Sequence, residues 1–120
     1  MTKKLCSAIL WATAMIAAQP AAAHHSFAMF DQTKQVELDG MLVTKFTWTN
    51  PHAFVMVQSG QTTYALECSS PNLMTHAGWN YQTLKAGDKV DIVFYPLRNG
   101  KPGGMLKTVK LADGKVLSGW

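Results

Sequence analysis

The sequence predicts a mainly β protein, a small OB-like barrel of five to six antiparallel strands with one short helix. Apolar residues recur at every second position in several short segments, which is the pattern of half-buried strands. A helix-start signal follows the third segment, and the first segment is long with a central glycine. This order favours an OB-like barrel, while an open antiparallel sheet or a small β-sandwich with one helix also fits. The expected strands cover residues 35–49, 52–59, 62–68, 89–95, 105–111 and 115–117.

The first expected strand is the longest, and two turns separate it from the next two. Gly40 lies within it and predicts a bend or bulge, because glycine in a strand marks such irregularities. Thr49-Asn50-Pro51 predicts the first turn and Gly60-Gln61 the second. The alternation of the first strand is carried by Val36, Leu38, Gly40, Leu42, Thr44, Phe46 and Trp48.

The single helix is expected over residues 71–76, with Ala77 as an alternative last residue. The preceding Ser69-Ser70 supplies a capping hydroxyl, and Pro71 suits the first helical position. Gly78 then ends the helix. Pro96 is expected to stop the fourth strand. Turns or loops are expected at residues 84–88, 98–104 and 113–114.

Residues 1–23 have the plan of a cleaved secretory signal. A positive Lys3-Lys4 pair precedes an apolar run over residues 5–18, and Ala21-Ala22-Ala23 supplies the small residues of a cleavage site. The apolar run is shorter than the ~20 residues that span a bilayer, although an uncleaved anchor is the alternative. We therefore expect a periplasmic or secreted single domain of residues 24–120, with no membrane span after processing.

Charge excludes some classes of partner. The 120-residue chain has a formal net charge of +4, and loss of Lys3 and Lys4 with the signal leaves about +2. So small a charge gives no support for nucleic acid or an anionic membrane as a partner.

Cleavage also leaves Cys68 as the only cysteine of the mature chain. An unpaired cysteine in an oxidising compartment is buried, ligates a metal or links to a partner. We expect burial, because a free cysteine packs as a small apolar residue.

Five short motifs, spread over nearly all of the mature chain, carry a family resemblance. They are His24-His25-Ser26-Phe27, Trp48-Thr49-Asn50-Pro51-His52-Ala53, Glu67-Cys68-Ser69-Ser70-Pro71, Gly78-Trp79 and Leu84-Lys85-Ala86-Gly87-Asp88. Together they resemble a group of small exported bacterial proteins known only as a domain of unknown function. The resemblance implies a periplasmic, signal-bearing single domain, and it brings no catalytic residues.

The sharpest functional hypothesis is copper binding through His24. After cleavage this residue is first in the chain, so its α-amine and imidazole can chelate one metal ion. A third nitrogen would complete the T-shaped arrangement called a histidine brace, which suits copper. The terminus resembles the copper sites of exported oxidative polysaccharide enzymes and of some periplasmic copper carriers, with no other shared motif.

His52 and His25 compete as the third ligand. Folding can bring His52 to the N-terminal arm, whereas His25 can bind Cu(II) together with a deprotonated amide. His76, on the expected helix, is a weaker candidate. His52 could instead cap a turn or bond a backbone carbonyl.

Two rival functions use the same fold. Trp48 and Trp79 lie beside turns and could line a ligand groove, which would make the protein a binding or assembly module for a sugar or a periplasmic protein. The other rival is a copper-dependent oxidase, which also needs an open coordination position.

No catalytic residues are assigned. Ser69 and Ser70 lack a nucleophile-elbow context, and a Cys68–His76 pair lacks an orienting third group. We therefore expect a binding protein in preference to an enzyme.

Overall fold

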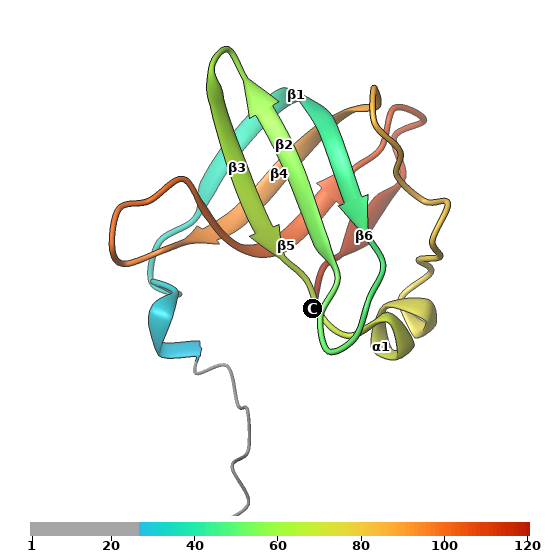
Figure 1. The fold of residues 1–120 in the computed structure, drawn as a ribbon, viewed down its shortest axis with the longest axis horizontal. Helices are drawn as coiled ribbons and strands as arrows, with labels where there is room; N and C mark the ends of the chain where they lie inside the picture. Colours follow the sequence, from blue (N-terminus) through green and yellow to red (C-terminus); the bar gives the residue numbers. More distant parts are fainter. Residues whose placement is uncertain (1–26) are drawn as a thin grey trace, which may run out of the picture.

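The computed structural model describes residues 27–120, which form a β-barrel with one end covered by a short helix (Figure 1). All the elements below lie in this part of the chain. They are the 3₁₀ helix η1 (Phe27–Met29), β1 (Val36–Thr47), β2 (Phe54–Ser59), β3 (Thr62–Glu67), α1 (Pro71–His76), β4 (Lys89–Pro96), β5 (Gly103–Lys110) and β6 (Val116–Ser118).

Strand pairing closes the barrel. The sheet order is β3-β2-β1-β4-β5-β6, and β3 also pairs with β5. The β3–β5 pairing is parallel, and the others are antiparallel. Five strands therefore form a closed ring, and β6 is added beside β5. This confirms the OB-like barrel with a helix between the third and fourth strands, because an open sheet or a sandwich would lack the closing pair.

The bend of β1 allows one strand to pair with two neighbours. Its first half pairs with β4 and its second half with β2, and the register shifts between Leu38 and Met41 and again between Val43 and Lys45. Gly40 lies at the first shift with φ +62°, and its N–H donates to Asp91 Oδ1 at 2.8 Å. The predicted bend at Gly40 is confirmed.

The helix has the predicted bounds and caps. The Ser70 hydroxyl accepts from the Leu73 N–H at 3.4 Å, and Pro71 is the first helical residue. Gly78 follows the C-cap at φ +93°, a conformation that glycine adopts without strain. Met74 is the buried residue of α1, and it joins the barrel core.

Some strand bounds differ from expectation. β5 begins at Gly103, two residues earlier than predicted, and Pro96 pairs with Gly104 as the last residue of β4. Residues 98–104 are predicted as a loop, but Gly103 and Gly104 belong to β5. Glycine is required at these two positions because other backbone atoms pack closely against them. A Cβ at Gly104 would overlap the carbonyl oxygen of Tyr95 and lie 2.8 Å from Phe94 Cδ2.

The second strand also begins later than predicted, at Phe54. His52 and Ala53 belong to the connection from β1, which contains a cis Asn50–Pro51 peptide bond. Ala53 still bonds to the chain beyond β3, donating to Ser69 O at 3.1 Å and accepting from Cys68 N at 2.9 Å. The connection is therefore fixed against the end of β3.

Cys68 lies in the core as a free thiol, as expected. Burial raises the pKa of Cys68 far above its ordinary value, and the neighbouring Glu67 carboxylate raises it further. The thiol is thus neutral and inaccessible in the folded protein.

We expect Cys68 to resist thiol reagents in the folded chain that begins at His24, and to react fully in denaturant. As the pH rises past 9.0, the ordinary pKa of a cysteine, the thiol ionises in the unfolded chain but not in the folded one. This difference in ionisation lowers the free energy of unfolding above that pH. A chromogenic thiol assay at about pH 8, with and without denaturant, measures the accessibility. Fast reaction of the folded protein would contradict the burial.

Candidate functional site

The described residues that are predicted for function lie in the β1–β2 connection and in or just after α1. His24 and His25 lie outside the described residues. His52 lies in the β1–β2 connection, at the same end of the barrel as α1 and the end of the chain (Figure 1). Trp48 directly follows β1, and Trp79 follows α1. His76 is exposed as the last residue of α1.

His52 is paired with a buried carboxylate. Its Nδ1 lies 2.5 Å from Glu67 Oε1, and the two side chains are only 19% and 8% exposed. Glu67 is the last residue of β3 and is in register with Phe54 of β2. The bonds between Ala53 and the residues after Glu67 hold the two backbones together, so the side-chain contact rests on a rigid frame.

The pairing has a clear physical reason. A carboxylate removed from water is costly unless a donor or a cation compensates it. The contact is an ion pair when the imidazole is protonated, and a neutral imidazole with its proton on Nδ1 still places that proton beside the carboxylate. In a neutral ring with the proton on Nδ1, the lone pair is at Nε2, the usual metal-binding form.

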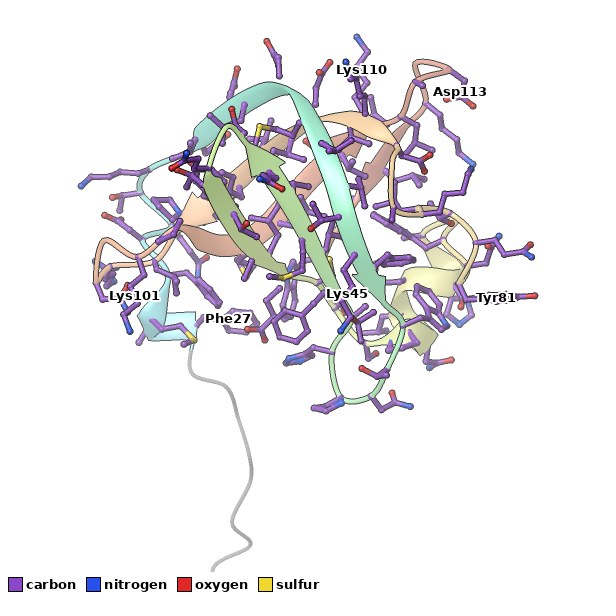
Figure 2. All side chains as sticks on the ribbon, turned by 45° about the horizontal axis from the view of Figure 1, so that its top comes forward. Phe27, Lys45, Tyr81, Lys101, Lys110 and Asp113 are labelled. Carbon is purple, nitrogen blue, oxygen red and sulfur yellow. The ribbon has the colours of Figure 1, made fainter. Side chains whose placement is uncertain are left out.

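Trp120 joins His52 to the start of the described chain. Its ring packs edge-to-face on His52, with centroids 5.3 Å apart, and on Phe27, with centroids 5.2 Å apart. Its indole N–H donates to the main-chain oxygen of Glu67 at 3.0 Å. We refer to His52, Glu67, Trp120 and Phe27 as the His52 cluster. Figure 2 shows Phe27 at the start of the described chain, beside the β4–β5 connection that carries Lys101.

The final residues are held in place beside β3 and β5. Gly119 accepts from Ser69 N at 2.8 Å and donates to Lys107 O at 3.0 Å. The indole N–H of Trp79 donates to Ser118 O at 2.7 Å. These bonds fix Ser118 and Gly119, and they place Trp120 against Glu67.

Trp79 is a core residue with 2% of its surface exposed. Phe46 packs against Trp79 at 5.8 Å and against Trp48 at 5.7 Å between ring centroids. Trp48 is half-buried against the same core. The structure therefore places both tryptophans around Phe46, and Trp79 has no free face on which a ligand could stack.

A hollow lined by other residues lies beside the β4–β5 connection. It has a volume of about 380 Å³ and lies between β3, β4 and the β4–β5 connection. Its lining includes Tyr64, Pro96, Lys101 and Pro102, and neither Trp48 nor Trp79 belongs to it.

Among residues 27–120, no three His, Cys, Asp or Glu side chains come together as a metal-binding group. The fixed pair of His52 and Glu67 could contribute one imidazole nitrogen, so a metal at this point needs ligands from elsewhere. Glu67 stands in one of the five motifs that carry the family resemblance, but neither Glu67 nor Trp120 is predicted from the sequence as a site residue. The available signal for Glu67 is its place in an apolar strand directly before a buried cysteine.

No helix in the described part of the chain is long and apolar enough to cross a membrane. No curated protein and no solved structure gives a significant match to the chain. A family model does match, over residues 13–107, and its description is a family of unknown function. The predicted resemblance to a domain of unknown function is thereby confirmed, and the chain belongs to the family DUF6152.

Proposed function

We propose that this protein binds copper outside the cytoplasm, through the amine and imidazole of His24 as the first residue of the mature chain and the imidazole of His52. Storage, delivery or sensing of copper are the roles that such a site would serve. The observation that carries the proposal is the edge-to-face contact of Trp120 with both His52 and Phe27.

The contact matters because it limits the distance to be bridged. Both centroid separations are close to 5 Å, so the rings of Phe27 and His52 are at most roughly 10 Å apart. His24 precedes Phe27 by three residues, and three residues of extended chain also span roughly 10 Å. The Phe27 backbone lies one side-chain length from its ring, so a chain that starts at His24 brings its amine to His52 where residues 24–26 extend toward that side chain.

The donor set suits copper better than other common metals. An amine and two imidazoles are nitrogen ligands, for which Cu(II) has the highest affinity among the divalent first-row metals. Cys68 is buried with a raised pKa, so it supplies no thiolate to redirect the preference. His25 is the competing third ligand, and it requires no approach to His52.

Processing is part of the proposal. The positive, apolar and small-residue regions of residues 1–23 support export and cleavage after Ala23. Only that cut converts the backbone nitrogen of His24 from an amide into an amine that can bind metal.

The test compares His24→Ala with His25→Ala in protein exported and processed by a bacterial host. Mass spectrometry first verifies the N-terminal residue of each. We expect 1:1 Cu(II) binding by the wild type with a Kd below about 1 nM. His24→Ala should weaken binding by about 100-fold or more, and His25→Ala should retain it, because only His24 supplies the amine–imidazole chelate. Competition against a strong chelator measures the Kd, and EPR counts the nitrogen ligands.

The two substitutions separate the two terminal binding modes. Full affinity in His24→Ala, with loss in His25→Ala, would replace the brace by an amine–amide–His25 site. Weak binding by the wild type, or a mature chain that lacks His24, would remove the copper proposal.

A second candidate is a binding module for a sugar or a periplasmic protein. The hollow of about 380 Å³ favours it, because Tyr64, Pro96 and Pro102 give apolar walls and Lys101 a polar group. Chemical-shift changes at these residues on addition of a ligand, with no change at His52, would support this second candidate.

A further inference from the structure

We propose that Glu67 is the positioning residue of the copper site, holding His52 so that Nε2 faces the metal. This inference rests on the proposed function and assigns a specific task to a residue that does not itself touch the ion. It makes the site depend on the end of β3 as well as on the N-terminal segment.

The geometry of the pair carries the inference. Glu67 Oε1 lies 2.5 Å from His52 Nδ1, and the carboxylate side chain is 8% exposed. A carboxylate in this position favours the proton on Nδ1 and hence the lone pair on Nε2. Carboxylates that accept from the second nitrogen of a metal-binding histidine orient the ring and increase its basicity.

The surroundings fix the orientation further. Trp120 donates its indole N–H to the main-chain oxygen of Glu67, and its ring forms an edge-to-face contact with His52. Rotation of the imidazole would therefore break the Glu67 contact and disturb the Trp120 packing together. The His52 side chain is 19% exposed and that of Glu67 is 8% exposed, so the imidazole is the more accessible of the two groups.

If the His52–Glu67 pair only stabilised the fold, changing Glu67 in a folded variant would leave the metal affinity unchanged. The first test is made on the metal-free protein, in which two-bond ¹H–¹⁵N NMR spectra report the His52 tautomer directly. We expect neutral His52 to carry its proton on Nδ1. A proton on Nε2 would overturn the inference whatever the copper affinity.

The second test measures Cu(II) affinity in Glu67→Gln, with Glu37→Gln at an exposed position of β1 as the matched control. Glutamine keeps the size and an acceptor oxygen but removes the charge. We expect the Kd of Glu67→Gln to rise about 10- to 100-fold, as is typical when such a partner is changed, and that of Glu37→Gln to stay the same. Glu67→Asp is the second variant if the first does not fold, because its shorter side chain withdraws the carboxylate while keeping the charge.

A double-mutant cycle shows whether Glu67 acts through His52. In a His52→Asn background, Glu67→Gln should cause no further loss of Cu(II) affinity. An equal loss in both backgrounds would show that the negative charge attracts copper directly, and it would overturn the positioning role.

The outcomes separate this inference from the proposed function. If the wild type does not bind copper tightly, both fall. If the wild type binds through three nitrogens and Glu67→Gln has the same Kd, the copper site stands and the role of Glu67 is wrong.

Discussion

His52→Asn should raise the Kd for Cu(II) by about 100-fold and reduce the EPR signature from three nitrogens to two. The asparagine amide can donate to Glu67 from nearly the position of Nδ1, but it has no counterpart of Nε2. The variant therefore keeps the buried carboxylate compensated, which an alanine would not, while removing the metal ligand.

His76→Asn is the matched control for this experiment. It removes an imidazole from the exposed end of α1, so it should leave both the affinity and the EPR spectrum unchanged. Thermal unfolding checks that each variant is folded. A His52→Asn protein with full affinity and three nitrogens would exclude His52 and indicate His25 as the third ligand.

Gly104→Ala should lower the free energy of unfolding by about 3 kcal/mol or more, because an overpacked position inside a closed barrel cannot relax easily. The added Cβ would overlap the Tyr95 carbonyl oxygen and press on the Phe94 ring. Gly104 also pairs with Leu66 of β3 and Pro96 of β4, so a shift of its backbone disturbs two strand pairs at once.

Urea unfolding of Gly104→Ala and Gly114→Ala measures this effect with an internal control. Gly114 has φ +88° and no atom within 4 Å of an added Cβ, so its substitution should cost only about 1 kcal/mol of backbone strain. The difference between the variants isolates the close approach of the strands. Equal losses of unfolding free energy in Gly104→Ala and Gly114→Ala would show that β4 and β5 do not pack closely at Gly104.

The elements that follow from local sequence were predicted well. The alternation in β1, the bend at Gly40 and the Ser70–Pro71 helix start all depend on residues a few positions apart. The OB-like order of strands and helix follows from these same signals, and so the fold class was predictable before any contact was known.

The start of β5 was predicted two residues too late because its first two glycines have two local interpretations. Gly103 and Gly104 in a Gly-rich stretch indicate a loop, yet in the barrel they let β5 pass close to Ala65 and Tyr95. The closing β3–β5 pair joins strands that are not consecutive, and no pattern within either strand specifies such a partner.

The sequence by itself determined the chemistry available to this protein: a histidine that becomes the first residue if cleavage follows Ala23, a second histidine beside a turn and one mature-chain cysteine. Only the tertiary structure decided which groups meet. It paired His52 with Glu67, placed Trp120 between His52 and Phe27, and buried Trp79 in the core. Pairing of β2 with β3 brings His52 to Glu67, whereas Trp120 reaches them because β6 pairs with β5 and Ser69 donates to Gly119. The contacts of Trp120 join segments far apart in the chain, and no local pattern encodes them.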